Sequence, residues 1–484
     1  MSSAEPKPKK PRKPRAPKPP KPPKKRKLTK SEQWLQLTAR QVGVYNCRDT
    51  LSTARLAKHL PTIFAKQGTE EYYRREVWPT VAPVLAMQRR GLAVDISERS
   101  RVRKQFEDEL AETDGTVLSL ASNADLNLNS TKQKAELLFG KLGLRSTRKT
   151  ESGAPSTDTE ALATILRNLR KMDEHARPIL EGLFHRSRIK TILERYLDFH
   201  VGNDGRVRPR IKFTGTKTER LAYAEPALQQ FPDEVRSFVV AEPGMCFVAA
   251  DSRQLEARIN AILSGDMPSL EAFARGESIH EVNARELFSY TQEQWDTLSE
   301  EQQKAAKNFA KSFFYGIVYG GEAESIKTKL YCPCPKCIGK IPPSITISRL
   351  EMRRIADRWF GRHPAVLRFR TELRDQVARF HYYQSPFGAK RWVFGPWRDV
   401  EREVYNLPMQ WCAARLTNRA MTRLHTLGAP IVLQMHDSLM LEVPEQEADE
   451  WTARLREEME RPVPELGGAV FPVDCKRGHR WSDL

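Results

Sequence analysis

The sequence predicts an α+β fold built around a central antiparallel sheet. Residues 245–251, MCFVAAD, form a continuous apolar run that ends in a carboxylate, which is typical of a buried strand. Residues 431–443, IVLQMHDSLMLEV, contain two apolar runs separated by a short polar turn, which predicts a hairpin. Most of residues 96–200, 268–330 and 351–380 follow helical periodicity instead. Strands that are set between blocks of helix favour the α+β class.

Helix start and stop signals place the remaining elements. Residues 31–60 have helical periodicity, and a second amphipathic helix within residues 76–95 ends at Gly91. A further helix begins at Ser130 or Thr131. In the segment GAPSTDTEALATILRNL we expect Ser156 or Thr157 as the N-cap, with Glu160 completing a capping box.

The net charge of +19 is concentrated at the N-terminus. Residues 1–31 hold 13 of the 80 Lys and Arg residues and one of the 61 acidic residues, and prolines interrupt them throughout. A segment of this composition cannot bury a core, so we expect a disordered basic arm. Its function is either an electrostatic tether to nucleic acid or a solubilising or localising tail.

The sequence shows neither a membrane-spanning segment nor a secretory signal peptide. No apolar run approaches the roughly 20 residues of a membrane span, and no apolar segment follows the N-terminal charges. The seven cysteines are an odd number, which favours a reducing compartment over a disulfide framework. These observations predict a cytoplasmic protein.

Three cysteines crowd into the segment YCPCPKCIGKIPP, residues 331–343. Cys332, Cys334 and Cys337 could supply three zinc ligands, but no second pair follows at close range. Candidates for a fourth ligand are Cys246, Cys412, Cys475 and His363. The alternative is a proline-stiffened loop with free thiols.

Two carboxylates stand at the ends of predicted strands. Asp251 ends the first strand, and Asp437 lies in the turn of the hairpin. If these strands are neighbours, both acids meet at one edge of the sheet. There they would share a proton or hold divalent cations. Either aspartate taken alone is better explained as a turn or cap residue than as a metal ligand.

A helix near residue 310 carries a stripe of cations and phenols. Lys307, Lys311, Tyr315 and Tyr319 recur at four-residue spacing, which places them on one helix face. Phe309, Phe313 and Ile317 fall on another face and can enter a core. Such a stripe suits a triphosphate at one end and a stacked base at the other. A solvated lysine face with core aromatics explains the spacing as well.

Together these motifs resemble the polymerase domain of family A DNA polymerases, the bacterial DNA polymerase I family. DSRQLEAR at 251–258 resembles D-Y-S-x-I-E-L-R, KNFAKSFFYGIVYG at 307–320 resembles R-x-x-x-K-x-x-x-F/Y-G-x-x-Y-G, and QMHDSL at 434–439 resembles Q-V-H-D-E-L. TERLAY, SIHEVNARELF and EREVYNLPMQWCAA match three lesser motifs, and all occur in the family's order over about residues 76–484.

The resemblance implies a right-hand polymerase fold with an antiparallel palm sheet and mostly helical thumb and fingers. It implies template-directed addition of dNTPs to the 3′-OH of primer–template DNA, with two Mg²⁺ ions as cofactors. It also implies a phage-type polymerase that acts as a monomer. Asp251, Asp437 and the carbonyl of Ser252 would hold the metal, and Lys311 would be catalytic. Residues implied at the nucleotide are Ser252, Gln254, Glu256, His280, Lys307, Lys311, Tyr315 and Tyr319. Residues implied at the DNA are Arg220, Arg402, Asn406, Gln410 and His436.

Several positions depart from the family pattern. Ser252 and Arg253 stand where the family has Tyr and Ser, and Ser438 stands where it has a second acid after the His-Asp pair. Trp411 replaces a Gly, and TERLAY lacks the Gly of T-G-R-L. Both metal carboxylates are intact, so these changes concern the geometry near the primer terminus.

The resemblance also divides the chain and predicts a missing activity. YNCRD, residues 45–49, resembles the Tyr-x-x-x-Asp motif that ends a 3′–5′ exonuclease, but the upstream Asp-x-Glu motif has no room. We therefore expect no proofreading in cis, and a separate exonuclease as one candidate partner. The predicted regions are a basic tail (1–31), an exonuclease remnant (32–75), the thumb with the palm entry (76–212), the first palm part (213–267), the fingers (268–390, with an insertion at 331–343) and the second palm part (391–484).

Two rival functions remain at this stage. The first is a single-subunit RNA polymerase, in which a small residue stands at the position of Glu256. The second is a non-catalytic DNA-binding factor derived from a polymerase, against which the retained Asp251, Asp437 and Lys311 argue.

Overall fold

The computed structural model describes residues 36–484, except for residues 151, 168, 170, 214 and 322–348. It divides into two compact units, residues 1–68 and 69–484. The described part of the first unit is α2 (Ala39–Gln67), which begins at a capping box of Thr38 and Gln41. It ends where Gly68 adopts a left-handed conformation that glycine tolerates best. The predicted basic tail, residues 1–31, lies outside the described residues.

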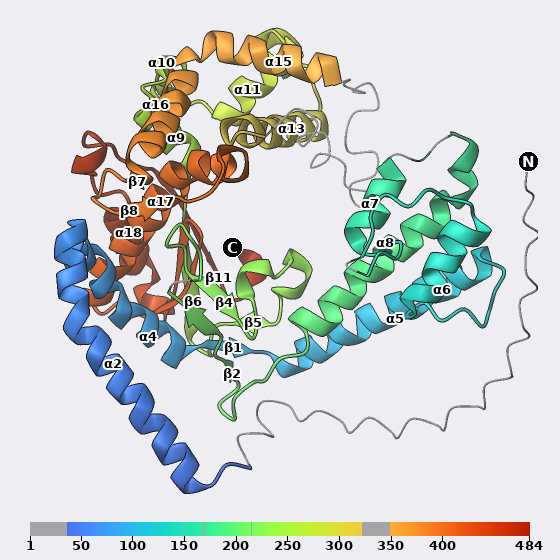
Figure 1. Ribbon diagram of the computed structural model, residues 1–484, viewed down its shortest axis with the longest axis horizontal. Coiled ribbons are helices and arrows are strands. Elements are labelled where there is room, and N and C mark those ends of the chain that lie inside the picture. Colours follow the sequence, from blue (N-terminus) through green and yellow to red (C-terminus); the bar gives the residue numbers. More distant parts are fainter. Residues whose placement is uncertain (1–35, 151, 168, 170, 214, 322–348) are drawn as a thin grey trace, which may run out of the picture. The chain divides into compact units, whose positions relative to one another are not determined.

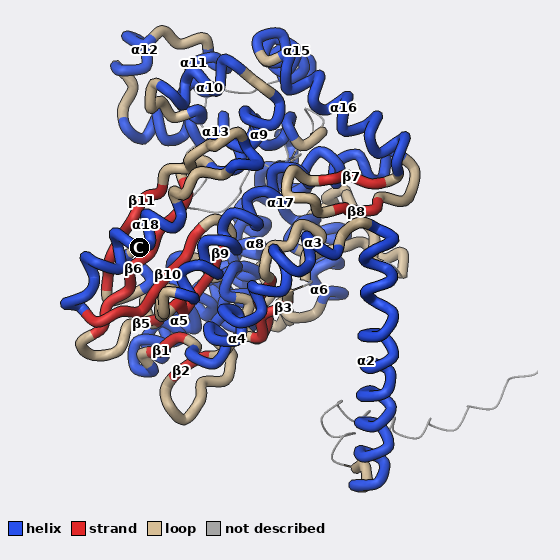
Figure 2. The backbone as a smooth tube through the Cα atoms, turned by 90° about the vertical axis from the view of Figure 1, so that its left-hand side faces the viewer, coloured by secondary structure: helices blue, strands red, loops and turns tan. Residues whose placement is uncertain are grey.

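A four-stranded antiparallel sheet forms the centre of the second unit, in the order β11-β6-β10-β9. Its strands are β6 (Met245–Ser252), β9 (Ile431–Met435), β10 (Ser438–Pro444) and β11 (Val473–Gly478). They lie side by side in Figure 2. The two apolar runs of the predicted hairpin are β9 and β10, and the predicted strand at 245–251 is β6. The predicted α+β class with a central antiparallel sheet is therefore confirmed.

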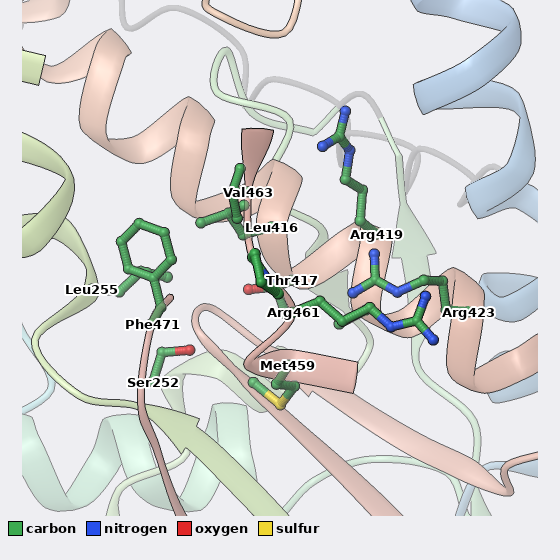
Figure 3. A pocket seen from close by; sticks show the side chains of 12 residues that line it. Ser252, Leu255, Leu416, Thr417, Arg419, Arg423, Met459, Arg461, Val463 and Phe471 are labelled. Atoms are coloured by element: carbon green, nitrogen blue, oxygen red, sulfur yellow. The ribbon is translucent and has the colours of Figure 1, made fainter. Parts of the chain in front are cut away.

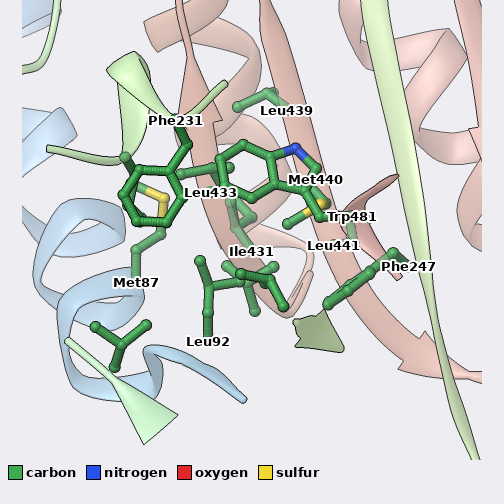
Figure 4. Close-up of a cluster of buried hydrophobic side chains, with 14 of the residues drawn as sticks. Met87, Leu92, Phe231, Phe247, Ile431, Leu433, Leu439, Met440, Leu441 and Trp481 are labelled. Atoms are coloured by element: carbon green, nitrogen blue, oxygen red, sulfur yellow. The ribbon is translucent and has the colours of Figure 1, made fainter. Parts of the chain in front are cut away.

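Helices and aromatic side chains bury this sheet. Contacts join α4 (Val81–Arg90) and α17 (Trp397–Thr426) to β9, and α18 (Ala448–Met459) to β6 (Figure 1). In the core, Phe247 and Leu441 are fully buried and cluster with Met87, Leu92 and Trp481 (Figure 4). Burying such side chains stabilises the fold by roughly 1.5–3 kcal/mol each, so the ends of these strands are fixed in place.

One helical block lies between β6 and α17 in the sequence. Its helices are α9 (Leu255–Ser264), α10 (Met267–Ala274), α11 (Ile279–Phe288), α12 (Gln292–Asp296), α13 (Glu300–Val318), α15 (Arg349–Arg362) and α16 (Pro364–Phe380). Trp295, Phe313 and Phe314 are buried in its core. The helical pattern predicted at 351–380 is two helices rather than one, because Pro364 has no N–H to donate and begins a new helix.

A second helical block precedes the sheet in the sequence. Its helices are α5 (Ile96–Leu120), α6 (Thr131–Ala135), α7 (Thr159–Arg167) and α8 (Arg177–Thr191). The cap expected for α7 was wrong, because Asp158 accepts the hydrogen bond from the backbone of Ala161 at 2.7 Å. Ser156 and Thr157 are buried instead.

Short strands complete the fold. They are β1 (Leu92–Val94), β2 (Arg206–Val207), β3 (Arg210–Lys212), β4 (Ala222–Ala224), β5 (Val239–Val240), β7 (Tyr382–Gln384) and β8 (Lys390–Trp392). None of the described helices is both long enough and apolar enough to span a membrane.

The helical block between β6 and α17 should lose stability as the pH rises. His363 is 1 % exposed, its Nδ1 lies 2.7 Å from Asp266, and its Nε2 lies 3.7 Å from Glu286. Although burial opposes the charge, the hydrogen bond to Asp266 and the negative charges of Asp266 and Glu286 raise the pKa of His363 from 6.5 to about 9. The charged ring therefore stabilises the folded state fully below pH 6.5, and we expect a loss of roughly 2 kcal/mol as the pH rises through about 9.

Thermal unfolding of the protein and of His363→Gln across this pH range tests the expectation. The variant should lack most of the alkaline loss, because Gln does not titrate. An equal alkaline loss in both proteins would assign the effect to other groups.

Candidate functional site

Two carboxylates meet where β6 ends and the β9–β10 turn begins. Asp251 on β6 pairs in register with Ser438, the first residue of β10. Asp437 precedes Ser438 in the turn, and its backbone oxygen accepts a hydrogen bond from the backbone N–H of Ser252 at 3.2 Å. His436 makes the tight turn in a left-handed conformation, with φ of 54°. The structure thus brings together the two predicted metal-binding aspartates.

Negative charge on the two aspartates is unfavourable at this site unless a cation compensates it. Burial raises the pKa of Asp437 to about 6; Arg220 opposes this rise, while Glu256 and Asp251 add to it. The carboxylate of Asp251 reaches solvent, yet the surrounding protein desolvates it and raises its pKa. Oδ1 of Asp437 is buried without a hydrogen-bond partner, and Nη2 of Arg220 is 3.7 Å away.

These residues fit magnesium. Mg²⁺ is usually held by one or two carboxylates together with substrate phosphates. Two adjacent carboxylates, one with an unpartnered oxygen, match that pattern. Among the described residues no group of three or more His, Cys, Asp or Glu side chains could hold a metal on its own. The predicted zinc ligands Cys332, Cys334 and Cys337 lie outside the described residues.

Glu256 stands at the centre of a second group of polar side chains. Gln254 adopts a left-handed conformation between β6 and α9, which turns the chain so that Glu256 falls in the first turn of α9. One oxygen of Glu256 accepts a hydrogen bond from Arg220 and the other from the hydroxyl of Tyr319. The side-chain oxygen of Gln254 accepts a 2.9 Å hydrogen bond from the backbone of Ile279, which ties α11 to this corner.

Helix α13 presents the predicted stripe toward this corner. Lys307, Lys311 and Tyr315 lie on α13, and Tyr319 follows as its C-terminal cap residue. The rings of Tyr315 and Tyr319 stack with their centroids 5.6 Å apart. Lys311 is exposed at the surface. The predicted core residues of the helix, Phe309, Phe313 and Ile317, are buried.

His280 joins the stripe from α11. Its ring packs edge-on against Tyr315 at 5.8 Å between centroids. Burial, followed by the charge of Lys311, lowers the pKa of His280 to about 4, so the ring is neutral at pH 7. Its Nδ1 is buried without a hydrogen-bond partner. A neutral imidazole beside a lysine can donate a hydrogen bond to a phosphate oxygen.

The predicted DNA-contacting residues of α17 share one helix face. Arg402, Asn406 and Gln410 recur at four-residue spacing on this helix. The Asn406 amide donates a 2.6 Å hydrogen bond to the backbone oxygen of Arg402, and its own side-chain oxygen is buried without a partner.

Sequence reasoning missed two acids that shape the site. Asp474 on β11 pairs in register with Asp251, and its charge adds to the raised pKa of that residue. Arg253 donates a 2.7 Å hydrogen bond to Asp474. The second acid, Glu219, occupies the position of the missing Gly in TERLAY and has a φ of 60°. The missing Gly was a usable signal for Glu219, whereas nothing in the sequence distinguished Asp474.

A small cavity lies behind Ser252, outside the carboxylate pair (Figure 3). It measures about 40 Å³ and is lined by Arg419, Arg423 and Arg461 together with apolar side chains. All three guanidinium groups are already paired with glutamates. The cavity is large enough for a few water molecules only, so it is no nucleotide site.

Comparison with known protein families identifies the family in which the carboxylate pair and the α13 stripe occur. Residues 97–483 match the model of DNA polymerase family A. The chain belongs to DNA polymerase family A. The predicted family is therefore confirmed.

Known family A proteins resemble the chain over most of its length. It is 29% identical over 471 residues to the thermostable DNA polymerase I of Thermus caldophilus, covering 92% of this chain and 52% of that protein. The Thermus aquaticus protein is 30% identical over 431 residues, covering 84% and 48%. The chain therefore spans about half the length of these curated relatives.

A solved family A structure shares the fold. The polymerase domain of Pol1 from M. smegmatis, in complex with a DNA primer-template and dNTP, superposes with a TM-score of 0.73 at 26% identity. The match covers 89% of this chain and 74% of that one.

Proposed function

We propose that the protein adds dNTPs to the 3′-OH of a primer, directed by a DNA template. The observation that carries the proposal is the meeting of Asp251 and Asp437 beside Glu256 and α13 in a family A chain. In the reaction the 3′-OH of the primer loses its proton to water, and its oxygen attacks the α-phosphorus of the dNTP. The bond to the β-phosphate breaks, and pyrophosphate leaves.

Asp251, Asp437 and the backbone carbonyl of Ser252 are the residues that would hold two Mg²⁺ ions. Bound there, Mg²⁺ activates the 3′-oxygen and neutralises the charge that develops on the leaving pyrophosphate. The raised pKa of Asp437 supports this assignment, because such a carboxylate gains most from a cation. The protein's own contribution is to position both reactants, so no covalent intermediate is needed.

The nucleotide would lie along the α13 stripe. Lys311 binds the triphosphate and gives a proton to the departing pyrophosphate, while neutral His280 donates a hydrogen bond to the β-phosphate. Lys307 adds a charge where the family usually has Arg, so it lacks bidentate contact with phosphate. Tyr315 packs against the sugar, and Tyr319 lies beside the nascent base pair. Ser252 and Gln254 border the same nucleotide.

The primer–template would lie against the α17 face and the hairpin turn. Arg402, Asn406 and Gln410 read minor-groove acceptors, which vary little with sequence. His436 in the turn contacts the primer terminus. Arg220, predicted from the sequence to contact DNA, pairs with Glu256 in this structure, and we assign it to the junction of the nucleotide and the primer terminus.

Glu256 favours DNA synthesis over the RNA polymerase alternative. Arg220 and Tyr319 both hold its carboxylate, so the side chain has a fixed position beside Tyr315. A fixed glutamate there would occupy the space that a ribose 2′-OH needs. The non-catalytic alternative gains no support, because both aspartates and Lys311 are present.

Primer extension tests the proposed function directly. The purified protein with Mg²⁺ should extend a labelled primer with dNTPs and much less with rNTPs. Without nucleotides it should leave single-stranded DNA intact, since Asp49 alone cannot assemble a two-metal nuclease site. Absence of extension would refute polymerase activity, a preference for rNTPs would favour the RNA polymerase, and metal-dependent 3′ degradation would refute the absence of proofreading. Such 3′ degradation would also remove the reason to expect a separate exonuclease as a partner near residues 32–75.

A further inference from the structure

Glu219 adopts a backbone conformation that side chains rarely take. Its φ is 60°, in the left-handed region, at the position where the family motif T-G-R-L has Gly. A non-glycine residue pays a conformational cost there and persists only if its surroundings hold it. Strain of this kind marks candidate functional positions.

The side chain of Glu219 is held by a half-buried tyrosine and a buried arginine. Its carboxylate accepts a 2.6 Å hydrogen bond from the hydroxyl of Tyr72 and an ion-paired hydrogen bond from Arg415. Arg415 is 2 % exposed and donates a further hydrogen bond to the backbone oxygen of Glu76. The carboxylate of Glu76 lies 3.8 Å from Arg415 but is shared with Arg419, so Glu219 is the nearer acid and its loss would leave the buried cation only partly compensated.

The backbone around Glu219 is fixed as well. The Asn418 amide donates a 3.4 Å hydrogen bond to the backbone oxygen of Glu219. The hydroxyl of Thr216 donates a 2.8 Å hydrogen bond to the backbone oxygen of Arg220. The peptide groups on both sides of the Arg220 α-carbon are thereby attached to their surroundings.

Arg220, the next residue, is the one that enters the site. Its guanidinium pairs with Glu256 and lies 3.7 Å from Asp437. Its Nε is buried without a hydrogen-bond partner, so no hydrogen bond from this atom orients the guanidinium. The contact with Glu256 therefore depends on the position of the Arg220 backbone. A continuous series of contacts therefore leads from Tyr72 and Arg415 through Glu219 to its neighbour Arg220.

We propose that Glu219 is a positioning residue, whose attachment to Arg415 and Tyr72 holds Arg220 against Glu256 and thereby fixes Glu256 for sugar discrimination. This proposal rests on the proposed polymerase function and deepens it. Tyr72 and Arg415 both donate to Oε2 of Glu219, and we assign Glu219 no direct contact with substrate.

The test compares dNTP and rNTP incorporation by Glu219→Gln. This variant keeps the size of the side chain and weakens the hold on Arg415. We expect the ratio of kcat/KM for dNTP to that for rNTP to fall about tenfold, because Glu256 loses its fixed partner. The matched control is Glu465→Gln. Glu465 pairs with Arg419 in the same ion-pair network (Figure 3 shows Arg419) but does not contact Glu219, and its variant should keep the wild-type ratio.

A double variant separates the loss of positioning from a loss of stability. In Glu219→Gln with Arg415→Met, no unpaired buried charge remains, so thermal stability should recover while the dNTP preference stays low. A wild-type ratio in Glu219→Gln, or a ratio that recovers together with stability in the double variant, would overturn the proposal and leave Glu219 a structural residue. Absence of extension by the wild-type protein would instead refute the polymerase function, so the two failures are distinguishable.

Discussion

Asp437→Asn should reduce primer extension by roughly 10³-fold. The substitution preserves the size of the side chain and removes the charge that, with Asp251, would hold Mg²⁺. Stability should move differently: burial raises the pKa of Asp437 to about 6, above its ordinary value, so the ionised form destabilises the folded protein at pH 7. We therefore expect the melting temperature of the variant to stay equal or to rise.

Steady-state primer extension and thermal unfolding measure the two effects. Asp449→Asn is a matched control, because Asp449 is an exposed aspartate on α18 that pairs with Arg477. The control should extend primers at the wild-type rate. Activity of Asp437→Asn near that of the control would remove Asp437 from the metal site, whatever its effect on melting.

Glu256→Ala should raise ribonucleotide incorporation relative to deoxyribonucleotide incorporation by about 10²-fold, the order of discrimination that a closed pocket achieves against one hydroxyl. Removal of the side chain opens the space beside Tyr315 and frees Arg220 and Tyr319 from their shared partner. We expect most of the change to come from improved use of rNTPs.

Single-nucleotide incorporation with matched dNTP and rNTP measures this ratio. Glu256→Gln separates the two contributions of the residue, since it keeps the volume and loses the charge. We expect Gln to lose about tenfold of the ratio, less than Ala, because it keeps the volume but is held less firmly by Arg220. If Ala left the ratio unchanged, sugar selection would have to depend on another side chain.

The sequence was informative wherever a signal is local. The apolar run of β6 and the two runs of the hairpin follow from strand periodicity, and the stripe on α13 follows from helical spacing. The α+β class and the adjacency of Asp251 and Asp437 could therefore be predicted. Family motifs then supplied roles that spacing alone leaves open.

Features that depend on distant partners could not be predicted. β11 has only one buried residue, Val473, so its pairing with β6 and the approach of Asp474 to Asp251 depend on the assembled sheet. The missing Gly of TERLAY marks the position of Glu219, but the partners that hold its side chain, Arg415 and Tyr72, are far away in the sequence. The cap of α7 was missed because three adjacent residues, Ser156, Thr157 and Asp158, can all cap a helix.

The pairing of Glu219 with Arg415 constrains how this sequence can diverge. The two positions are 196 residues apart, yet each neutralises the other inside the protein. Loss of Glu219 removes the nearer acid of buried Arg415, and loss of Arg415 leaves half-buried Glu219 with only Tyr72 as a partner, so a lineage crosses between a neutral and a charged pair most readily by changes at both sites. Glutamate at this position is thus inherited together with its arginine, and libraries that vary the TERLAY segment without α17 will mostly sample unstable combinations.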